Sequence, residues 1–361
     1  MSQTIYSYIR ASAGLSWLQP ALLGEESRLQ TYAGLIGQIE STVATLNALG
    51  IGRGDRVALA LPNGPDAAVC SISVACAATS APLNPASTPA EFRNYLTRIN
   101  PKAVIVDDRK ESHAASIAKG LGIAVIRLVS EPDKPAGTFR LEGTPQTASH
   151  TGFAEPDDVA LLVLTSGSTS RPKLAPLTHR NVTSGAMNNV VQLGLTDKDR
   201  CLCVAALFYT QGILVSVLSS LFAGGSVACT PGYDPVRFFE WLDEFQPTWY
   251  AAPTALQQSI VARAAQYPEI VARANLRVIR SSSAHAGSDL IEKVEKLFRA
   301  PMLDSYGLTE TSSTIVGEPL PPARRKHGSV GIAFGCEIGI ADELGRLLPV
   351  GATGEVLVRG P

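Results

Sequence analysis

Short apolar runs that alternate with helical segments constrain the fold of this chain more than any other feature. Residues 56–61 and 103–106 are strand-like, whereas residues 34–49 have helical apolar spacing and residues 67–78 are rich in small apolar side chains. Alternation of strands and helices is typical of βαβ units, whose strands pair in parallel. We therefore predict an α/β fold built on parallel sheets.

The second half of the chain continues this pattern and then changes. Residues 159–164 are uninterrupted apolar residues, which predicts a central strand. The polar, proline-containing residues 130–157 before it predict a surface connection. Residues 276–279 and 288–298 predict a further strand and helix. From about residue 317, short strand-like runs and turns predict a small β unit.

Length and charge limit the classes of function. A chain of 361 residues suggests two or three folding units. A content of 45% hydrophobic and 17% charged residues excludes a disordered chain. The formal net charge of −1 argues against a general nucleic-acid-binding protein. No signal peptide is recognisable, and the serines within residues 212–222 favour a buried helix over a membrane span.

The cysteines indicate reduced thiols and not a metal or disulfide framework. None of them forms a CxxC pair, and all lie among apolar or small residues, which predicts core thiols of a cytoplasmic protein. They are Cys70, Cys76, Cys201, Cys203, Cys229 and Cys336.

Residues 165–173, T-S-G-S-T-S-R-P-K, form the strongest candidate site. Hydroxyl groups and loop amides donate to phosphate oxygens, and Lys173 adds a positive charge. The carboxyl end of a parallel strand is also where α/β folds bind ligands. The sequence is not a Walker A loop, because Gly167 lacks the required Gly-Lys partner. A polar surface turn is the alternative interpretation of the composition.

As an ordered string, this loop resembles the T-S-G-[ST]-T-G-x-P-K-G signature of the adenylate-forming superfamily, which includes acyl-CoA synthetases, luciferases and peptide-synthetase adenylation domains. Ser170 and Leu174 replace the two later glycines of that signature. The Ser-Arg-Pro-Lys version is similar to the subgroup that contains oxalate–CoA ligases. The resemblance implies that the loop holds the β and γ phosphates of ATP. The implied cofactor-binding residues here are Thr165, Ser166, Gly167, Ser168, Thr169 and Lys173, with Lys173 also counted as catalytic.

Residues 304–311, D-S-Y-G-L-T-E-T, resemble the Y-G-x-T-E motif of the same superfamily. The Tyr306 ring can lie along adenine, and Gly307 lets the backbone approach the nucleotide. The Thr309 hydroxyl can reach the α phosphate, and the Glu310 carboxylate can bind Mg²⁺. We therefore predict Thr309 and Glu310 as catalytic residues, Glu310 as the metal ligand and Ser305 as a substrate contact.

Residues 280–286, R-S-S-S-A-H-A, resemble the superfamily segment that lines the adenine and acyl pocket. The resemblance implies that Ser282, Ser283 and Ala284 contact the nucleotide. His285 is a candidate partner for a carboxylate or phosphate; it could equally cap the next helix or face solvent. The triple serine again resembles the oxalate-ligase subgroup.

Residues 205–212 resemble the P-L-F-H-x-x-G stretch near the acyl pocket. We expect Tyr209 and Gly212 to contact the acid substrate. Peptide-synthetase domains that activate α-amino acids usually carry an aspartate here, and residues 208–213 include no acidic residue. An α-amino acid substrate is therefore disfavoured.

The resemblance covers nearly the whole chain and implies a domain organisation. Residues 1–361 would form the large N-terminal domain, with subdomains 1–40 together with 185–312, and 45–183. Residues 315–361 would begin a β-barrel. The T-G-D motif and the small C-terminal domain with its lysine do not follow, so we expect weak or no adenylation by these residues alone.

The implied function is ATP-dependent activation of a carboxylic acid to an acyl-adenylate, with release of pyrophosphate and then thioester formation. The implied cofactors are ATP, Mg²⁺ and CoA, or the phosphopantetheine of a carrier protein. Two alternatives remain open. One is a peptide-synthetase type of adenylation domain that loads a carrier protein, and the other is a non-catalytic nucleotide- or acyl-binding relative.

Overall fold

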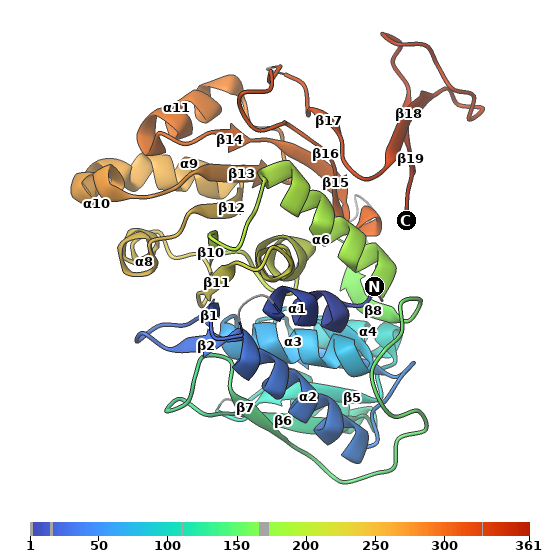
Figure 1. Ribbon diagram of the computed structural model, residues 1–361. Coiled ribbons are helices and arrows are strands. Elements are labelled where there is room, and N and C mark those ends of the chain that lie inside the picture. The colour runs from blue at the N-terminus through green and yellow to red at the C-terminus, as the bar shows by residue number, and fades with distance from the viewer. Residues whose placement is uncertain (1–2, 15–16, 110, 166–172, 327) are drawn as a thin grey trace.

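The computed structural model describes residues 3–14, 17–109, 111–165, 173–326 and 328–361. Two seven-stranded sheets organise these residues, as Figure 1 shows. The first sheet runs from the upper part of the view down to β1 and β2 near the middle, and its neighbouring strands are parallel except for this last pair. In spatial order its strands are β14 (Met302–Leu303), β13 (Val278–Ser282), β12 (Trp249–Pro253), β10 (Arg200–Cys203), β11 (Ser226–Cys229), β1 (Pro20–Leu23) and β2 (Leu29–Thr31).

The second sheet has five parallel strands in its middle and an antiparallel strand at each edge. In spatial order its strands are β7 (Phe139–Glu142), β6 (Ala124–Ser130), β5 (Ala103–Asp107), β3 (Arg56–Ala60), β4 (Thr79–Pro82), β8 (Val159–Leu164) and β9 (Leu174–Thr178). The prediction of an α/β fold with two parallel-rich sheets is therefore confirmed.

Helices cover both sheets and join their strands. The α-helices are α1 (Ile5–Ala13), α2 (Tyr32–Ala48), α3 (Pro65–Ala77), α4 (Pro89–Ile99), α5 (His113–Gly120), α6 (His179–Leu193), α7 (Ser219–Phe222), α8 (Arg237–Phe245), α9 (Thr254–Arg263), α10 (Pro268–Arg273) and α11 (Ser288–Phe298). A π-helix, η1 (Gln211–Leu218), precedes α7, and η2 (Ala264–Gln266) and η3 (Thr309–Thr311) are short 3-10 helices. No helix within the described ranges is long and apolar enough to cross a membrane.

Two of our strand predictions need correction. The polar segment 130–157 contains β7, whose buried Phe139 and Leu141 alternate with exposed residues, so an edge strand looked like a loop. The strand at 159–164 is β8, but β8 is not central, because it lies next to the edge strand β9. Strand β9 was not predicted because it contains Pro176, and proline argues against a strand. Proline is nevertheless tolerated on an edge strand such as β9.

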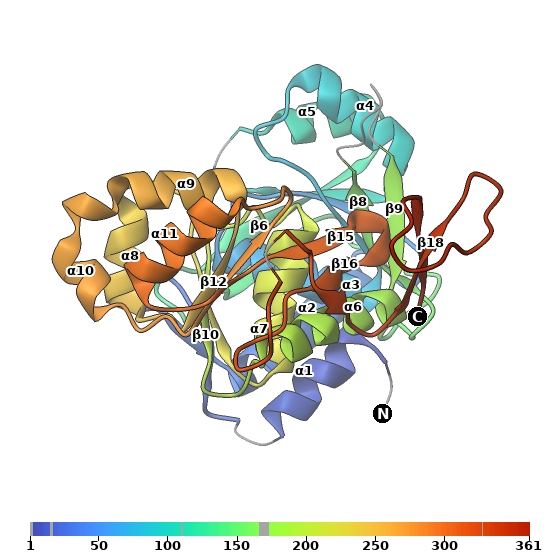
Figure 2. The same ribbon diagram turned by 90° about the horizontal axis from the view of Figure 1, so that it is seen from above.

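The C-terminal part forms two small antiparallel sheets. One contains β15 (Ser305–Leu308), β16 (Ser313–Gly317) and β17 (Ile332–Ala333), and the other is the hairpin of β18 (Glu337–Ala341) and β19 (Glu355–Arg359). Figure 2 shows this hairpin projecting from the body on the side opposite α8 and α10. The small β unit predicted from about residue 317 therefore exists, whereas its assignment to a β-barrel stays a prediction.

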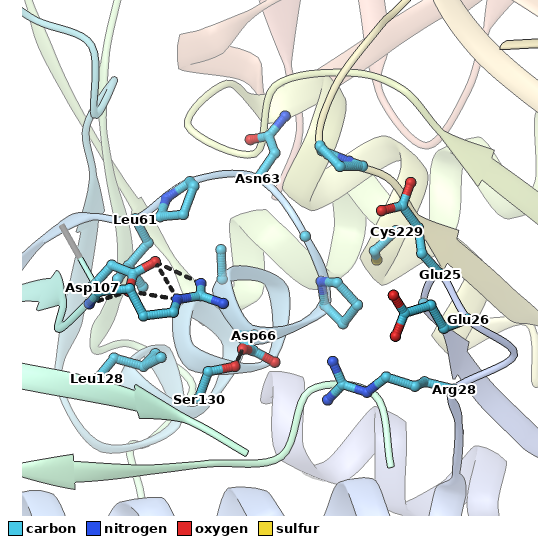
Figure 3. Close-up of a pocket in the computed structure, with 17 residues that line it drawn as sticks. Glu25, Glu26, Arg28, Leu61, Asn63, Asp66, Asp107, Leu128, Ser130 and Cys229 are labelled. Atoms are coloured by element: carbon cyan, nitrogen blue, oxygen red, sulfur yellow. Dashed lines mark hydrogen bonds and ion pairs between the residues drawn. The ribbon is translucent and has the colours of Figure 1, made fainter. Parts of the chain in front are cut away.

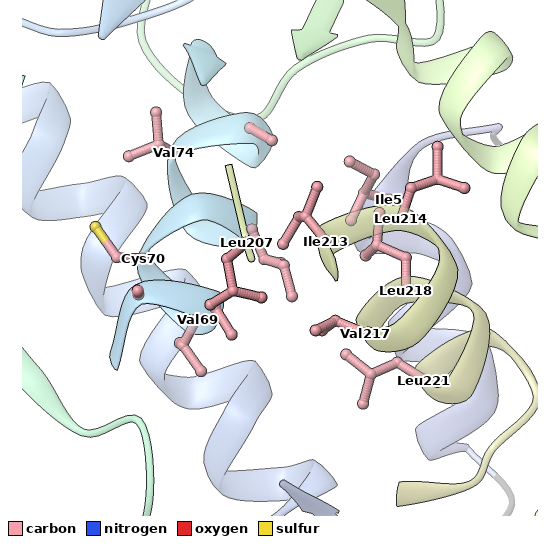
Figure 4. Close-up of a cluster of buried hydrophobic side chains, with 14 of the residues drawn as sticks. Ile5, Val69, Cys70, Val74, Leu207, Ile213, Leu214, Val217, Leu218 and Leu221 are labelled. Atoms are coloured by element: carbon pink, nitrogen blue, oxygen red, sulfur yellow. The ribbon is translucent and has the colours of Figure 1, made fainter. Parts of the chain in front are cut away.

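The hydrophobic core joins the two halves through helices. Val69, Cys70 and Val74 of α3 belong to the same cluster of buried apolar side chains as Ile213 and Val217 of η1, and Figure 4 shows part of this cluster. The predicted buried helix at 212–222 is thus confirmed as η1 followed by α7, and residues 212–222 are all buried. Five of the six cysteines are also buried, Cys336 is partly exposed, and all six are free thiols.

His179 connects three separate helices at their ends. It is fully buried at the start of α6, its Nδ1 accepts from the Ile5 amide at 3.2 Å, and its Nε2 lies 3.0 Å from the Ala75 carbonyl. Both ring nitrogens are thus satisfied by a neutral imidazole whose proton is on Nε2. Burial lowers the pKa of His179 to about 4. The interaction holds α1, α3 and α6 together.

Candidate active site

A cavity of about 550 Å³ opens where the carboxyl ends of β8 and β13 approach β15. Its lining is mostly hydroxyl, amide and charged groups, and Leu308 is the one large apolar residue among those described there. The lining residues are Thr165, Thr210, Gln211, Arg280, Ser282, Ser283, Ser305, Gly307, Leu308, Thr309, Glu310 and Ser313. The cavity therefore suits a polar, charged ligand more than an apolar one.

The end of β8 brings one flank of the predicted phosphate loop to this cavity. The Thr165 amide donates to the Lys173 carbonyl at 2.9 Å, which closes the pairing of β8 with β9. The Thr165 hydroxyl is buried and has no hydrogen-bond partner among the described residues. Lys173 is exposed and does not line the cavity. The predicted residues Ser166, Gly167, Ser168 and Thr169 lie outside the described residues.

The strand pair β15–β16 carries the second motif to the mouth of the cavity. Gly307 is required for this close pairing, because a Cβ there would lie 1.5 Å from the Ser313 carbonyl oxygen. The Leu308 amide donates to the Thr311 hydroxyl at 3.0 Å, and the short helix η3 presents Thr309 and the exposed Glu310. Ser305, Gly307, Thr309 and Glu310 all line the cavity, whereas the half-buried Tyr306 does not.

The end of β13 supplies the third part of the lining. Ser282 is buried, and Ser283 has a left-handed φ of 73°, which costs a serine free energy and is a conformation concentrated at functional sites. Ala284 and His285 lie outside the lining. His285 is 56% exposed, and its Nδ1 lies 3.1 Å from Asp304 Oδ2. It does not cap α11, since no side chain caps that helix.

The predicted acyl-pocket residues lie apart from this cavity. Tyr209 is half exposed and lines a neighbouring cavity of about 260 Å³, which shares Thr165 with the first. Gly212 is buried, and a Cβ there would lie 2.3 Å from the Ala206 carbonyl oxygen, so its role is a close backbone approach. Between them, Thr210 and Gln211 do line the larger cavity.

Arg280 is the site residue to which sequence analysis assigned no role. It is 3% exposed, and its Nη2 donates to the Thr314 hydroxyl at 2.6 Å. Burial lowers the pKa of Arg280 to about 10, although the nearby Asp304 opposes the shift. The sequence did contain an indication that Arg280 is unusual, because this charged residue directly follows the apolar residues of β13. Periodicity alone does not show which cavity such a side chain enters.

The donor set fits Mg²⁺ only as a partner of a phosphate ligand. Among the described residues, no group of three or more His, Cys, Asp or Glu side chains could hold a metal ion. The cavity offers one carboxylate, Glu310, together with several hydroxyl groups. Mg²⁺ is commonly bound by one or two carboxylates plus substrate phosphates. The buried, unpartnered atoms Thr165 Oγ1 and Gln211 Nε2 likewise fit a polar ligand such as a nucleotide.

A second cavity, of about 220 Å³, lies at the carboxyl ends of β3, β5 and β6 (Figure 3). Some of its charged groups are paired within the protein, whereas Asp66 Oδ1 is buried without a partner among the described residues. Arg109 forms an ion pair with Asp107 at 2.6 Å, and Ser130 donates to Asp66. None of the residues predicted for the site lines it. We therefore take the cavity of about 550 Å³ as the candidate active site.

Comparison with known proteins shows the family of this chain. A family profile described as AMP-binding enzyme matches residues 16–361. The oxalate–CoA ligase of Arabidopsis thaliana is 33% identical over 92% of this chain and 66% of its own length. The oxalate–CoA ligase of Saccharomyces cerevisiae is 30% identical over 85% of this chain and 60% of its own length. This chain thus spans about two thirds of the length of these curated relatives.

Solved structures show the same fold. The crystal structure of ATP-bound MatB from Rhodopseudomonas palustris aligns with a TM-score of 0.85 and 26% sequence identity. The alignment covers 100% of this chain and 70% of that chain.

Proposed function

The chain belongs to the AMP-binding enzyme family, and on this premise we propose that it activates a carboxylic acid with ATP and transfers the acyl group to CoA. In the first step a carboxylate oxygen attacks the α phosphate of ATP, which gives an acyl-adenylate and pyrophosphate. In the second step the CoA thiol replaces AMP and a thioester forms. The observation that carries the proposal is the cavity in which residues from three separate motifs meet.

Each group of predicted site residues has a distinct task in this proposal, although Lys173, Tyr306 and Ala284 do not line the cavity. Hydroxyl groups at the end of β8 and the flanking loop bind the terminal phosphates, with Lys173 as a counter-charge. The Thr309 hydroxyl binds the α phosphate, and the Glu310 carboxylate binds Mg²⁺, which when bound neutralises phosphate charge. Ser282 and Ser283 lie along the nucleotide with Tyr306 and Ala284. Fixed positions of the reacting groups lower the barrier further.

The CoA acceptor is supported by the relatives named above, both of which are CoA ligases. The substrate named for both relatives also supports a small acid such as oxalate for this chain. We extend the proposal to a cytoplasmic location, which is supported by the six free cysteines.

The test is carboxylate-dependent exchange of pyrophosphate into ATP by the full natural reading frame, across a panel of acids. We expect exchange with one class of acid, and thioester formation when CoA is added. A Lys173→Ala variant should lose most of the exchange because it lacks the phosphate counter-charge. Binding of MgATP without exchange with any acid would instead support a binding-only relative. Transfer to a carrier protein but not to CoA would support the other alternative.

A further inference from the structure

Arg280 is a buried cation whose side chain is only partly used by the protein. Its Nη2 is anchored to the Thr314 hydroxyl at 2.6 Å, and that hydroxyl donates to Asn189 Oδ1 at 2.8 Å. Asn189 is itself held by the Gly185 carbonyl at 2.7 Å. This chain of bonds fixes the direction of the guanidinium group. The remaining atoms Nε and Nη1 are buried and have no partner among the described residues.

The nearby Asp304 carboxylate does not neutralise Arg280 by a direct bond. Asp304 accepts from the amides of Ser305 and Ala286, at 3.0 and 3.2 Å, and contacts His285. No ion pair of Arg280 occurs among the residues that the structure describes. A buried charge without a paired anion is strongly unfavourable, and buried unsatisfied N–H groups add to that cost. A bound anion would relieve both.

The position of Arg280 favours the acid substrate over the nucleotide as the source of that anion. The residues proposed to bind phosphate and Mg²⁺ include Thr309 and Glu310, which lie at the exposed mouth of the cavity. Arg280 is 3% exposed and contacts the buried Thr314 instead. A guanidinium group has a planar fork of donors that matches a carboxylate.

We infer that Arg280 binds a second carboxylate of the acid that this site activates, so that the substrate is a small dicarboxylic acid. The inference rests on the proposed function and adds a specificity-determining residue to it. One carboxylate of the acid reacts with ATP, and the other is held at the closed end of the cavity by Arg280. The polar lining agrees with this, because a fatty or aromatic acid would place apolar surface against serine and threonine hydroxyls.

The test compares matched acids on the full natural reading frame and on variants of Arg280. The acids are short dicarboxylates and the monocarboxylates of equal carbon number, and the measurements are pyrophosphate exchange and calorimetric binding of acid and of MgATP. We expect the wild-type protein to prefer the dicarboxylate, and R280M to lose about 100-fold in kcat/KM for it, the scale expected for removing one partner of a buried charge pair. Activity with the monocarboxylate and affinity for MgATP should change less than about 3-fold.

Two further variants guard against a merely structural explanation. T314V keeps the positive charge but removes its anchor, and we expect about a 10-fold loss for the dicarboxylate, the scale of one hydrogen bond to a charged group. R280K should recover part of the loss. The matched control is R200M, because Arg200 is a partly buried arginine of β10 that hydrogen-bonds the Phe245 carbonyl outside the cavity. It should leave the preference between the two acids unchanged.

The outcomes separate the inference from the proposed function. Equal losses of both acids and of MgATP in R280M would assign Arg280 to a nucleotide phosphate and overturn the inference. Unchanged preference in R280M would also overturn it, while exchange by the wild-type protein would still support the proposed function. Absence of all exchange, together with dicarboxylate binding that R280M abolishes, would support the anion site and reject acid activation.

Discussion

His179 and Arg280 are both buried basic side chains, but the protein satisfies their polar atoms to different degrees. Both ring nitrogens of His179 have backbone partners, from Ile5 and Ala75. Arg280 uses one nitrogen on Thr314 and leaves two without partners among the described residues. Burial alone therefore does not distinguish a structural residue from a functional one. The difference lies in whether the surrounding fold completes the hydrogen bonds.

The largest effect is expected when the negative charge at the mouth of the cavity is removed. Glu310→Gln should lower pyrophosphate exchange about 100–1,000-fold, as for other groups that stabilise charge in a transition state. The unfolding temperature should hardly change, because Glu310 is exposed. Glu343→Gln, at an exposed position of the β18–β19 hairpin, is the matched control. Equal activity of the two variants would show that the Glu310 carboxylate has no part in the reaction.

A smaller effect is expected when the pH is lowered, because the protonation of His179 should then reduce the stability of the folded protein. Its folded pKa of about 4 lies below the ordinary 6.5, so the unfolded chain takes up the proton first. The neutral His179 makes its full contribution to the free energy of unfolding above pH 6.5. As the pH falls towards 4, the free energy of unfolding should decrease by about 3 kcal/mol in total. Urea unfolding of the wild-type protein and His179→Gln at several pH values measures this loss.

His179→Gln should be less stable than the wild-type protein at pH 7, by about 1–3 kcal/mol. The reason is that the buried amide of Ile5 or the carbonyl of Ala75 loses its hydrogen-bond partner. The difference between the two proteins should shrink at pH 4. A difference that stays constant with pH would mean that His179 does not titrate in this window. Affinity for MgATP should be equal in the two folded proteins, in contrast with variants in the cavity.

The smallest expected effect concerns backbone strain beside Arg280. Ser283 has a φ of 73° and Ser27, outside the cavity, has a φ of 58°. Replacing either with glycine should raise the free energy of unfolding by up to about 1 kcal/mol, since glycine adopts this conformation at no steric cost. Only Ser283→Gly should alter exchange, because its hydroxyl lies 3.5 Å from Gln211 Oε1. Equal pyrophosphate exchange by both variants would show that the backbone strain at Ser283 has no part in the reaction.

Much of the fold was predictable because its strands are buried and its helices have clear ends. The helix predicted at 288–298 is α11 with the same bounds, and the strand at 159–164 is β8. The two edge strands were missed for a physical reason. The outward residues of β7 are the charged Arg140 and Glu142, and β9 contains Pro176, so neither has the continuous apolar run of a central strand.

The candidate site was predictable where an ordered motif carried it. Such motifs placed Ser305, Thr309 and Glu310 in one cavity lining. Arg280 and Thr314 were not predicted, because their contact joins residues that are 34 positions apart. Tyr209 was expected beside the substrate but lines a neighbouring cavity, since a linear pattern does not show which way a turn projects its side chain.

Because most of its thiols are buried, this protein should be labelled selectively at one cysteine. All six cysteines have raised pKa values because burial disfavours the thiolate, which is the form that reacts with maleimides, and five of them are also buried away from a reagent. Cys336 is partly exposed and lines a small cavity with Glu310 and Val358 of β19. A fluorophore attached through a maleimide should therefore label Cys336 first. Its emission would report on nucleotide arriving at the neighbouring carboxylate, without any engineered substitution.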